Sequence, residues 1–326
     1  MVRRTRAMST TRPLLYVSRL LPHAVMALIE ERFRLVQDPT ETSPTPAAFR
    51  EGFAQAEAAI CTLTDIVDGD LLSSAAHLKI LANFAVGYNN IDLDAARRHQ
   101  IVVTNTPDVL TDATADLAWA LLLAAARRVI EGDTLVRSSR WTGWTPTQLL
   151  GSEVSGKTLG IIGMGRIGHA VAQRAEGFHM VIRYYNHRVN PALPEAWARR
   201  SLDALLQESD FVTLHVPLNS ETRHLIGTRE LSLMRPAAIL INTSRGAVVD
   251  EAALVHALQS GTIAGAGLDV YEEEPMVHPV LPSLKQVVLL PHLGSATMQT
   301  RVQMGLICLQ NIQAVLEGRP APNRVA

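Results

Sequence analysis

One glycine-rich loop, Gly163–Gly168, constrains the fold of this 326-residue chain more than any other feature. It reads Gly-Met-Gly-Arg-Ile-Gly, a GxGxxG pattern. The apolar residues Leu159–Ile162 directly before it predict a short buried strand, and Arg166–Glu176 predict a helix directly after it. A strand, this turn and a helix in succession are typical of a dinucleotide-binding βαβ unit. A glycine-rich turn without a ligand is the alternative, and the flanking strand and helix make it the weaker one.

Each glycine of the loop has its own expected role. Gly163 permits the tight turn, Gly165 lets the backbone approach a pyrophosphate, and Gly168 lets the helix pack close to the strand. The first helical turn, which begins at Arg166 and Ile167, offers backbone N–H groups to the phosphates. The loop therefore predicts a bound dinucleotide cofactor.

Short β-type runs alternate with helical segments in both halves of the chain. Apolar runs typical of buried parallel strands are Leu14–Val17, Ala59–Thr62, Leu78–Leu81, Ile101–Val103, Leu159–Ile162, Val181–Tyr185 and Phe211–Leu214. This alternation predicts an α/β protein with two Rossmann-like domains and mostly parallel sheets. A helix predicted over Thr300–Leu316 follows the last strand and can return to the first domain, which would make that domain discontinuous.

Composition narrows the range of partners. The net charge is −1, which gives no reason to expect a nucleic acid or an anionic membrane as partner. The longest apolar run, Leu117–Ala126, is too short to span a bilayer and predicts a buried helix. Cys61 and Cys308 are far apart, so neither a disulfide framework nor a metal cluster is predicted. Both are expected to be buried thiols in a reducing cytoplasm.

Three polar residues in the second half, Arg245, Glu274 and His292, each follow a predicted strand. The strands are Ala238–Asn242, Ile263–Val270 and Val287–Leu290, in that order. In open α/β sheets, ligands lie beyond the carboxyl ends of the strands. We therefore expect the three side chains along one edge of the sheet, the edge that also carries the glycine loop.

These residue types suit the reduction of a 2-oxo acid, in which a hydride reaches carbon and a proton reaches oxygen. Arg245 can hold the substrate carboxylate with two parallel hydrogen bonds. His292 is the expected proton donor, because the reference pKa of histidine, about 6.5, lies near working pH. A glutamate beside the ring stabilises the imidazolium. Glu272, Glu273 and Glu274 are adjacent, so we expect at least one of them in solvent.

A structural role is the alternative for any one of these residues. A single arginine is often part of a structural ion pair, and most of the eleven histidines must be structural. The ordered set of three is much less easily explained in that way.

The residues after the strand Val181–Tyr185 bear on which cofactor is used. A carboxylate at this position would accept hydrogen bonds from the adenosine ribose hydroxyls. The chain instead has Asn186, His187 and Arg188, none of them acidic, and an arginine can pair with a 2′-phosphate. The sequence therefore predicts NADPH over NADH, with NAD possible. A solvated Arg188 and weak selectivity are the alternative.

Several motifs resemble the D-isomer-specific 2-hydroxyacid dehydrogenase family, and together they span nearly the whole chain. They are the glycine loop, Thr243–Gly246, Gly267–Val270 with Glu274-Pro275, and Pro291–Thr297. Within the family the chain is most similar to glyoxylate/hydroxypyruvate reductases. That closer similarity rests on two segments, Thr106–Asp116 and Trp141–Trp144.

The resemblance implies roles for individual residues. Arg245 would bind substrate, His292 would be the proton donor, and Glu274 would be its partner. Val86 and Gly87 would present backbone donors to the substrate carboxylate. The remaining residues expected at the cofactor are Asp269 at the nicotinamide carboxamide, His215, Val216 and Pro217 on the adenine side, and Thr243, Ser244 and Gly294.

The resemblance also implies an architecture. Residues 108–297 would form the dinucleotide-binding domain, and residues 1–107 and 298–326 the substrate-binding domain. Members are usually homodimers joined through the dinucleotide-binding domains. Trp141 would then reach toward the partner subunit's site, although a place in the core is an equal alternative.

The expected function is the NADPH-dependent reduction of glyoxylate to glycolate and of hydroxypyruvate to D-glycerate. Two alternatives stay open at this point. One is another D-2-hydroxyacid dehydrogenase, acting on phosphoglycerate or on longer 2-oxo acids. The other is a non-enzymatic, nucleotide-sensing corepressor, since the family includes such scaffolds.

Overall fold

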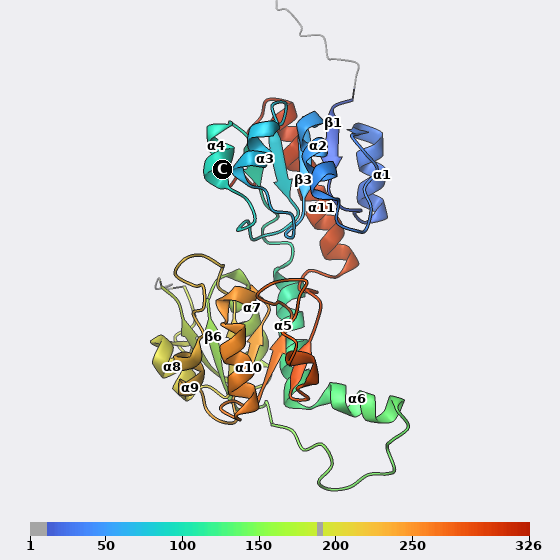
Figure 1. Cartoon of the computed structure of the whole chain (residues 1–326). Coiled ribbons are helices and arrows are strands. Elements are labelled where there is room, and N and C mark those ends of the chain that lie inside the picture. The colour runs from blue at the N-terminus through green and yellow to red at the C-terminus, as the bar shows by residue number, and fades with distance from the viewer. Residues whose placement is uncertain (1–11, 188–191) are drawn as a thin grey trace, which may run out of the picture. The chain divides into compact units, whose positions relative to one another are not determined.

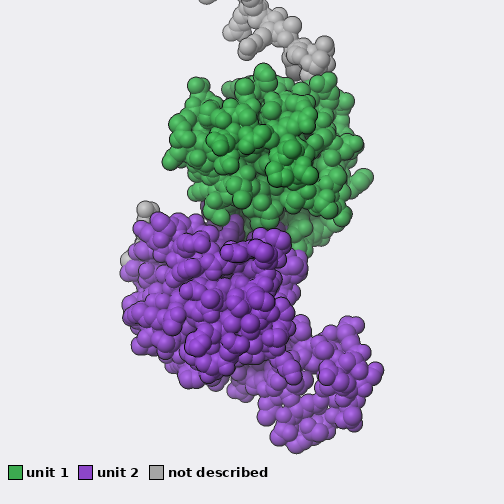
Figure 2. Space-filling view, viewed as in Figure 1, with its two compact units in different colours: residues 1–110, 296–326 green, residues 111–295 purple. Residues whose placement is uncertain are grey.

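Two parallel sheets organise residues 12–187 and 192–326, which the computed structural model describes. The chain divides into unit 1, residues 1–110 and 296–326, and unit 2, residues 111–295 (Figures 1 and 2). Each unit has one sheet, and the pairings between its strands are parallel. The predicted α/β class with two Rossmann-like domains is confirmed.

Unit 1 has a five-stranded sheet in the order β2-β1-β3-β4-β5. Its strands are β1 (Leu14–Val17), β2 (Arg34–Leu35), β3 (Ala58–Cys61), β4 (Ile80–Asn83) and β5 (Val102–Thr104). Its helices are α1 (His23–Arg32), α2 (Pro46–Gln55), α3 (Gly69–Ser74), α4 (Leu93–Arg98) and α11 (Met298–Leu316). The strand predicted over Leu78–Leu81 begins only at Ile80, because the Leu78 N–H closes a turn onto the Ala75 carbonyl.

The C-terminal helix α11 is part of the core of unit 1 (red in Figure 1). Met304, Cys308 and Ile312 are spaced by four residues, which places them on one face of the helix, and all three are buried. Gly305 lies so close to α1 that an added Cβ would be 2.6 Å from Val25 Cγ1. Burial of apolar side chains therefore packs the C-terminal helix into unit 1, together with elements from the first third of the chain.

Unit 2 has a seven-stranded sheet in the order β12-β11-β10-β9-β6-β7-β8. Its strands are β6 (Thr158–Ile162), β7 (Val181–Tyr185), β8 (Ala198–Arg199), β9 (Phe211–Leu214), β10 (Ile239–Asn242), β11 (Gly265–Leu268) and β12 (Val287–Leu289). Its helices are α5 (Thr111–Ala126), α6 (Val129–Arg137), α7 (Arg166–Glu176), α8 (Leu202–Glu208), α9 (Thr228–Leu233) and α10 (Glu251–Gln259), with 3₁₀ turns η1 (Gly246–Val248) and η2 (Leu281–Ser283). Strand β6 lies between β9 and β7, so the direction of winding reverses there. Open α/β sheets bind ligands at such a switch point.

Helices α5 and α6 differ sharply in burial. The predicted buried helix is the second half of α5, where Leu121 and Leu122 are buried. Trp119 of α5 stacks on Phe178 with ring centroids 4.6 Å apart. None of the described side chains of α6 is buried, and α6 projects from the body of unit 2 with the loop that follows it (Figure 1). Within residues 12–187 and 192–326, no helix combines the length and apolar character that a bilayer crossing requires.

Candidate active site

The three glycines of the nucleotide loop differ in their surroundings. Gly163 has φ +98°, which favours glycine, and an added Cβ would lie 2.7 Å from the His215 carbonyl carbon. An added Cβ on Gly168 would lie 2.1 Å from the Gly163 oxygen, so α7 packs directly on the turn. At Gly165, no atom lies within 4 Å of an added Cβ. Gly163 and Gly168 are therefore needed for close packing, and Gly165 borders open space.

The first turn of α7 has backbone N–H groups that can donate to a ligand beside the glycine loop. Gly165 is the N-cap residue and provides no side-chain hydrogen bond, and the first N–H groups of a helix have no acceptor within it. Thr243, in the turn after β10, adds a buried hydroxyl without a hydrogen-bond partner among the described residues. Open space beside Gly165, helix N–H groups and an unpartnered hydroxyl fit the phosphates and polar groups of a dinucleotide.

The residues predicted at the cofactor follow six strands of one parallel sheet. After β6 come Gly163, Gly165, Arg166, Ile167 and Gly168; after β7, Asn186 and His187; after β9, His215, Val216 and Pro217; after β10, Thr243 and Ser244; after β11, Asp269; and after β12, Gly294. Because the strands are parallel, their carboxyl ends form one edge of the sheet, and these residues share it. Arg188 lies outside the described residues.

His215 contributes a neutral ring to this edge. Burial lowers the pKa of His215 to about 3, so the imidazole carries no charge near neutral pH. Its Nε2 shares a hydrogen bond of 2.9 Å with the Thr213 hydroxyl, and its backbone N–H donates to Ile162 at 2.7 Å. The residue is therefore held against the end of β6, beside the glycine loop.

Arg199, on the edge strand β8, holds the backbone that follows β7. Its guanidinium donates to the Asn186 carbonyl at 2.9 and 3.2 Å and to the His187 carbonyl at 3.3 Å. Glu221 lies 3.7 Å from the His187 ring, and both side chains are exposed. Sequence reasoning missed Arg199 because a two-residue edge strand has no detectable periodicity.

His292 and Glu274 form a directly bonded pair. His292 Nδ1–H donates to Glu274 Oε2 at 2.8 Å, and both side chains are partly buried. The other carboxylate oxygen, Oε1, accepts the Tyr271 N–H at 3.1 Å, so the carboxylate is held at both ends. His292 Nε2 has no bonded partner in the part of the chain that the structure describes. The ring therefore has one nitrogen fixed by a carboxylate and one available for proton exchange.

Electrostatics keep Glu274 ionised. Burial raises the pKa of the Glu274 carboxyl, but the hydrogen bond from His292 and the charges of His292 and Arg245 outweigh burial. The pKa of Glu274 therefore lies below its ordinary value. Burial lowers the pKa of Arg245 and Glu274 opposes that effect, but a guanidinium stays charged at working pH. Arg245 thus lies within electrostatic reach of the pair.

The three adjacent glutamates separate, as expected. Glu273 is exposed. Glu272 accepts the Nε2–H of His224 at 2.5 Å and the backbone N–H of Glu251 at 3.3 Å. Of the three, Glu274 alone bonds to His292 in the described structure.

Asn242, the last residue of β10, organises the turn that carries Arg245. Its Oδ1 accepts the N–H and Oγ–H of Ser244 at 3.0 and 2.8 Å, and its Nδ2–H donates to the Arg245 carbonyl at 2.9 Å. An added Cβ on Gly246 would lie 1.8 Å from the Tyr271 carbonyl carbon, so this turn packs on the segment leading to Glu274. Sequence reasoning did not single out Asn242, although a polar amide that ends an apolar strand is a detectable signal.

Asp269 anchors the loop that carries His292. Its Oδ1 accepts the Leu293 N–H at 2.6 Å, its Oδ2 accepts the Gly294 N–H at 2.8 Å, and its carbonyl accepts the His292 N–H at 2.9 Å. Asp269 is only 1% exposed. Burial raises the pKa of Asp269, and the two N–H donors partly oppose that rise. The predicted contact of Asp269 with a nicotinamide carboxamide stays a prediction, and the bonds to the His292 loop were not foreseen.

The remaining predicted substrate residues belong to other parts of the chain. Val86 and Gly87 follow β4 in unit 1 and are half-buried. Trp141 lies in the loop after α6 with 51% of its surface exposed, so the alternative that it is a core residue is wrong. The physical reason is that its neighbours in the chain, residues 138–147, are all exposed and form no core in which the ring could be buried.

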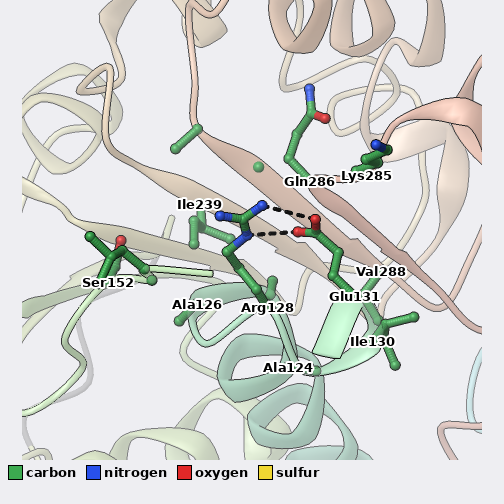
Figure 3. Close-up of a pocket in the computed structure, with 15 residues that line it drawn as sticks. Ala124, Ala126, Arg128, Ile130, Glu131, Ser152, Ile239, Lys285, Gln286 and Val288 are labelled. Carbon is green, nitrogen blue, oxygen red and sulfur yellow. Dashed lines mark hydrogen bonds and ion pairs between the residues drawn. The ribbon is translucent and has the colours of Figure 1, made fainter. Parts of the chain in front are cut away.

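A cavity of about 360 Å³ opens at the other edge of the seven-stranded sheet (Figure 3). It is lined by Ile239 and Gly265, the first residues of β10 and β11, and by residues next to α6. Arg128 Nε and Nη2 donate to the two oxygens of Glu131 at 2.8 and 2.9 Å inside it. The cavity is therefore remote from the carboxyl-end site, and Arg128 and Glu131 form an ion pair within it.

Comparisons with known proteins agree with this geometry. Residues 119–294 match the family model described as D-isomer specific 2-hydroxyacid dehydrogenase, NAD binding domain. A glyoxylate reductase of Thermococcus litoralis is 49% identical over 320 residues, which cover 96% of this chain and 97% of that protein.

Solved structures are similar over nearly the full length. A Thermus thermophilus protein has a TM-score of 0.91 at 44% identity and covers 96% of this chain and 100% of its own. An NADPH-dependent glyoxylate/hydroxypyruvate reductase of Sinorhizobium meliloti, in complex with NADP and malonate, has a TM-score of 0.87 at 36% identity, with 97% of each chain covered. The chain therefore belongs to the D-isomer-specific 2-hydroxyacid dehydrogenase family and is an NAD(P)-dependent oxidoreductase of that family.

Proposed function

We propose that this enzyme reduces glyoxylate to glycolate and hydroxypyruvate to D-glycerate, with NADPH as the preferred reductant. The observation that carries the proposal is the His292–Glu274 pair on the same sheet edge as the open glycine loop. The glyoxylate reductase identified above, 49% identical over nearly the whole chain, supports the substrate class.

Different residues bind the substrate, donate the proton and position the proton donor. When bound, the reduced nicotinamide supplies the hydride. Arg245 binds the substrate carboxylate and polarises the neighbouring carbonyl. His292 donates its Nε2 proton to the carbonyl oxygen, and Glu274 fixes the ring through Nδ1 and stabilises the charged imidazolium before transfer. Val86 and Gly87 supply backbone donors to the carboxylate.

The cofactor preference rests on residues after β7. Asn186 replaces the acid that would accept the ribose hydroxyls, and Arg188 is proposed to pair with a 2′-phosphate. Arg199 supports this choice, because it fixes the two carbonyls of the segment that leads to Arg188.

A substrate panel followed by NADPH absorbance tests the proposal. Glyoxylate and hydroxypyruvate should show higher kcat/KM values than pyruvate, phenylpyruvate and phosphohydroxypyruvate. NADPH should be used at least about tenfold better than NADH, the value of one charge-assisted hydrogen bond. Equal or better use of NADH would overturn the cofactor preference. If none of the five acids caused oxidation of NADPH or of NADH, the corepressor alternative would be favoured over the reductase.

Replacing Glu274 with glutamine should move the pH-rate profile. The imidazolium loses its carboxylate partner, so the limb on which reduction slows as pH rises should shift to lower pH. Glu273→Gln is the matched control, because Glu273 is an exposed neighbour in the same segment and should leave the profile unchanged. Identical profiles for the two variants would exclude the coupling of Glu274 to the proton donor.

We further propose a homodimer joined through unit 2, in a reducing cytoplasm. Val136, Trp144 and Leu150, in α6 and the loop after it, are 59%, 79% and 67% exposed, and a second copy would cover them. Trp141 belongs to the same loop and is proposed to approach the partner subunit's site. Sedimentation equilibrium of the full chain measures the oligomeric state, and a monomer would contradict the proposed dimer.

The proposed compartment is consistent with the cysteines. The buried free thiols of Cys61 and Cys308 fit a reducing cytoplasm.

A further inference from the structure

The loop after β4 contains three consecutive peptide groups with the same bonding pattern. The carbonyls of Ala85, Val86 and Gly87 all accept hydrogen bonds, and that of Ala85 accepts the Thr106 N–H at 2.9 Å. The N–H groups that share these peptide planes belong to Val86, Gly87 and Tyr88. None of these three N–H groups has an acceptor within residues 12–187 and 192–326.

Two asparagine side chains hold the second and third of these carbonyls. Asn105, which follows β5, donates its Nδ2–H to the Val86 carbonyl at 2.8 Å. Asn83, the last residue of β4, donates its Nδ2–H to the Gly87 carbonyl at 2.8 Å. Asn83 is fully buried, and its Oδ1 accepts the Cys61 thiol at 3.5 Å, so its amide orientation is fixed from both ends.

Planarity of the peptide group gives these contacts a directional consequence. In a trans peptide the carbonyl and the N–H point in opposite directions, so a bond that fixes one also fixes the other. Asn105 thereby sets the direction of the Gly87 N–H, and Asn83 sets that of the Tyr88 N–H. Successive backbone donors without internal acceptors form the kind of site that binds anions.

We infer that Asn105 and Asn83 are positioning residues for the substrate carboxylate, and that the Tyr88 N–H is a third backbone donor to it. This inference rests on the proposed function, in which Val86 and Gly87 bind that carboxylate. In these three peptide groups the carbonyls are occupied and the N–H groups have no acceptor among the described residues, so the groups suit a carboxylate and would repel a cation. The asparagines act through the peptide groups and do not themselves contact the substrate.

Binding of oxalate to the NADP-loaded enzyme tests the inference without requiring turnover. Calorimetry should show that Asn105→Ala raises the Kd for oxalate about tenfold, because one charge-assisted hydrogen bond loses its alignment. The KM for glyoxylate should rise by a similar factor, while kcat changes much less and the KM for NADPH stays constant. Failure of wild-type protein to bind oxalate, or an unchanged oxalate Kd in the variant, would overturn the inference.

Asn311→Ala is the matched control. Asn311 is a fully buried asparagine of the same unit whose amide donates to Ile307 and Asn323, not to the loop. It should lower the Tm and leave the Kd for oxalate unchanged. An equal rise in Kd in both variants would show that the effect is a general loss of stability.

Asn105→Asp adds a further measurement, the pH dependence of the Kd for oxalate. This dependence would not change if Asn105 had only a structural role. The ionised aspartate cannot donate to the Val86 carbonyl, whereas the protonated acid can. The reference pKa of an aspartate carboxyl is about 3.9, so the ratio of variant to wild-type Kd should fall as the pH is lowered from about 6 to about 4 and the carboxyl becomes protonated. A ratio independent of pH would contradict the donor role. If wild type binds oxalate but reduces no 2-oxo acid, the reductase proposal fails while the assignment of the loop stands.

Discussion

His292→Ala is expected to lower kcat for the reduction of glyoxylate by about 10²–10⁴-fold, the usual contribution of a general acid. The structure gives this residue one nitrogen bonded to Glu274 and one without a partner among the described residues. Proton donation is an interaction of the transition state, so kcat should fall while the KM for NADPH changes little. Steady-state kinetics with NADPH fluorescence titration separate the two effects.

Imidazole added to the His292→Ala variant provides the complementary experiment. The side chain is 23% exposed, so the space left by its removal should be accessible from solvent. Added imidazole should restore part of kcat with a pH dependence of its own. Turnover within about tenfold of wild type without imidazole would exclude His292 as the proton donor.

The shared edge of the site could be predicted from the sequence because it follows from strand direction alone. Arg245, Glu274 and His292 each come just after an apolar run, and carboxyl ends of parallel strands must meet at one edge. The pattern could not choose among Glu272, Glu273 and Glu274. That choice depends on partners such as His224, which is 48 residues away from Glu272 in the chain.

The contacts by which residues hold the site in place could not be predicted, for the same physical reason. Periodicity reports which face of an element is buried, but it does not identify the partner of a buried polar group. Asn242 and Asp269 both lie at strand ends, yet their bonding is visible only when the turns after neighbouring strands are in place. Arg199 belongs to a strand of two residues, too short for any pattern.

His292 itself has a backbone conformation that needs such support. Its φ is +56°, in the left-handed region, where a non-glycine residue is strained by about 1–2 kcal/mol. Three hydrogen bonds to Asp269 follow within three residues, from the N–H groups of His292, Leu293 and Gly294. A strained residue persists only where its surroundings hold it in place, and here a single buried aspartate supplies that hold.

Asp269→Asn should therefore reduce activity as well as stability. The asparagine can accept only one of the two N–H groups, and its own NH₂ would face the other, leaving buried donors unpaired. The free energy of unfolding should fall by about 1–3 kcal/mol. Relaxation of the loop would displace the His292 ring from Glu274, and a displacement of about 1 Å at a reacting group can lower kcat about a hundredfold. Chemical denaturation and steady-state kinetics measure the two losses.

Asp210→Asn separates the two losses. Asp210 also accepts a backbone N–H, from Thr158 at 2.9 Å, but it precedes β9 and so lies at the opposite edge of the same sheet. The Asp210→Asn variant should lose stability, while its kcat should stay unchanged. If Asp269→Asn behaved like this control, Asp269 would have no positioning role. If the Kd for NADPH rose in parallel with the fall in kcat, Asp269 would instead hold the nicotinamide carboxamide. Loss of kcat with unchanged NADPH binding is the result that assigns Asp269 to the His292 loop.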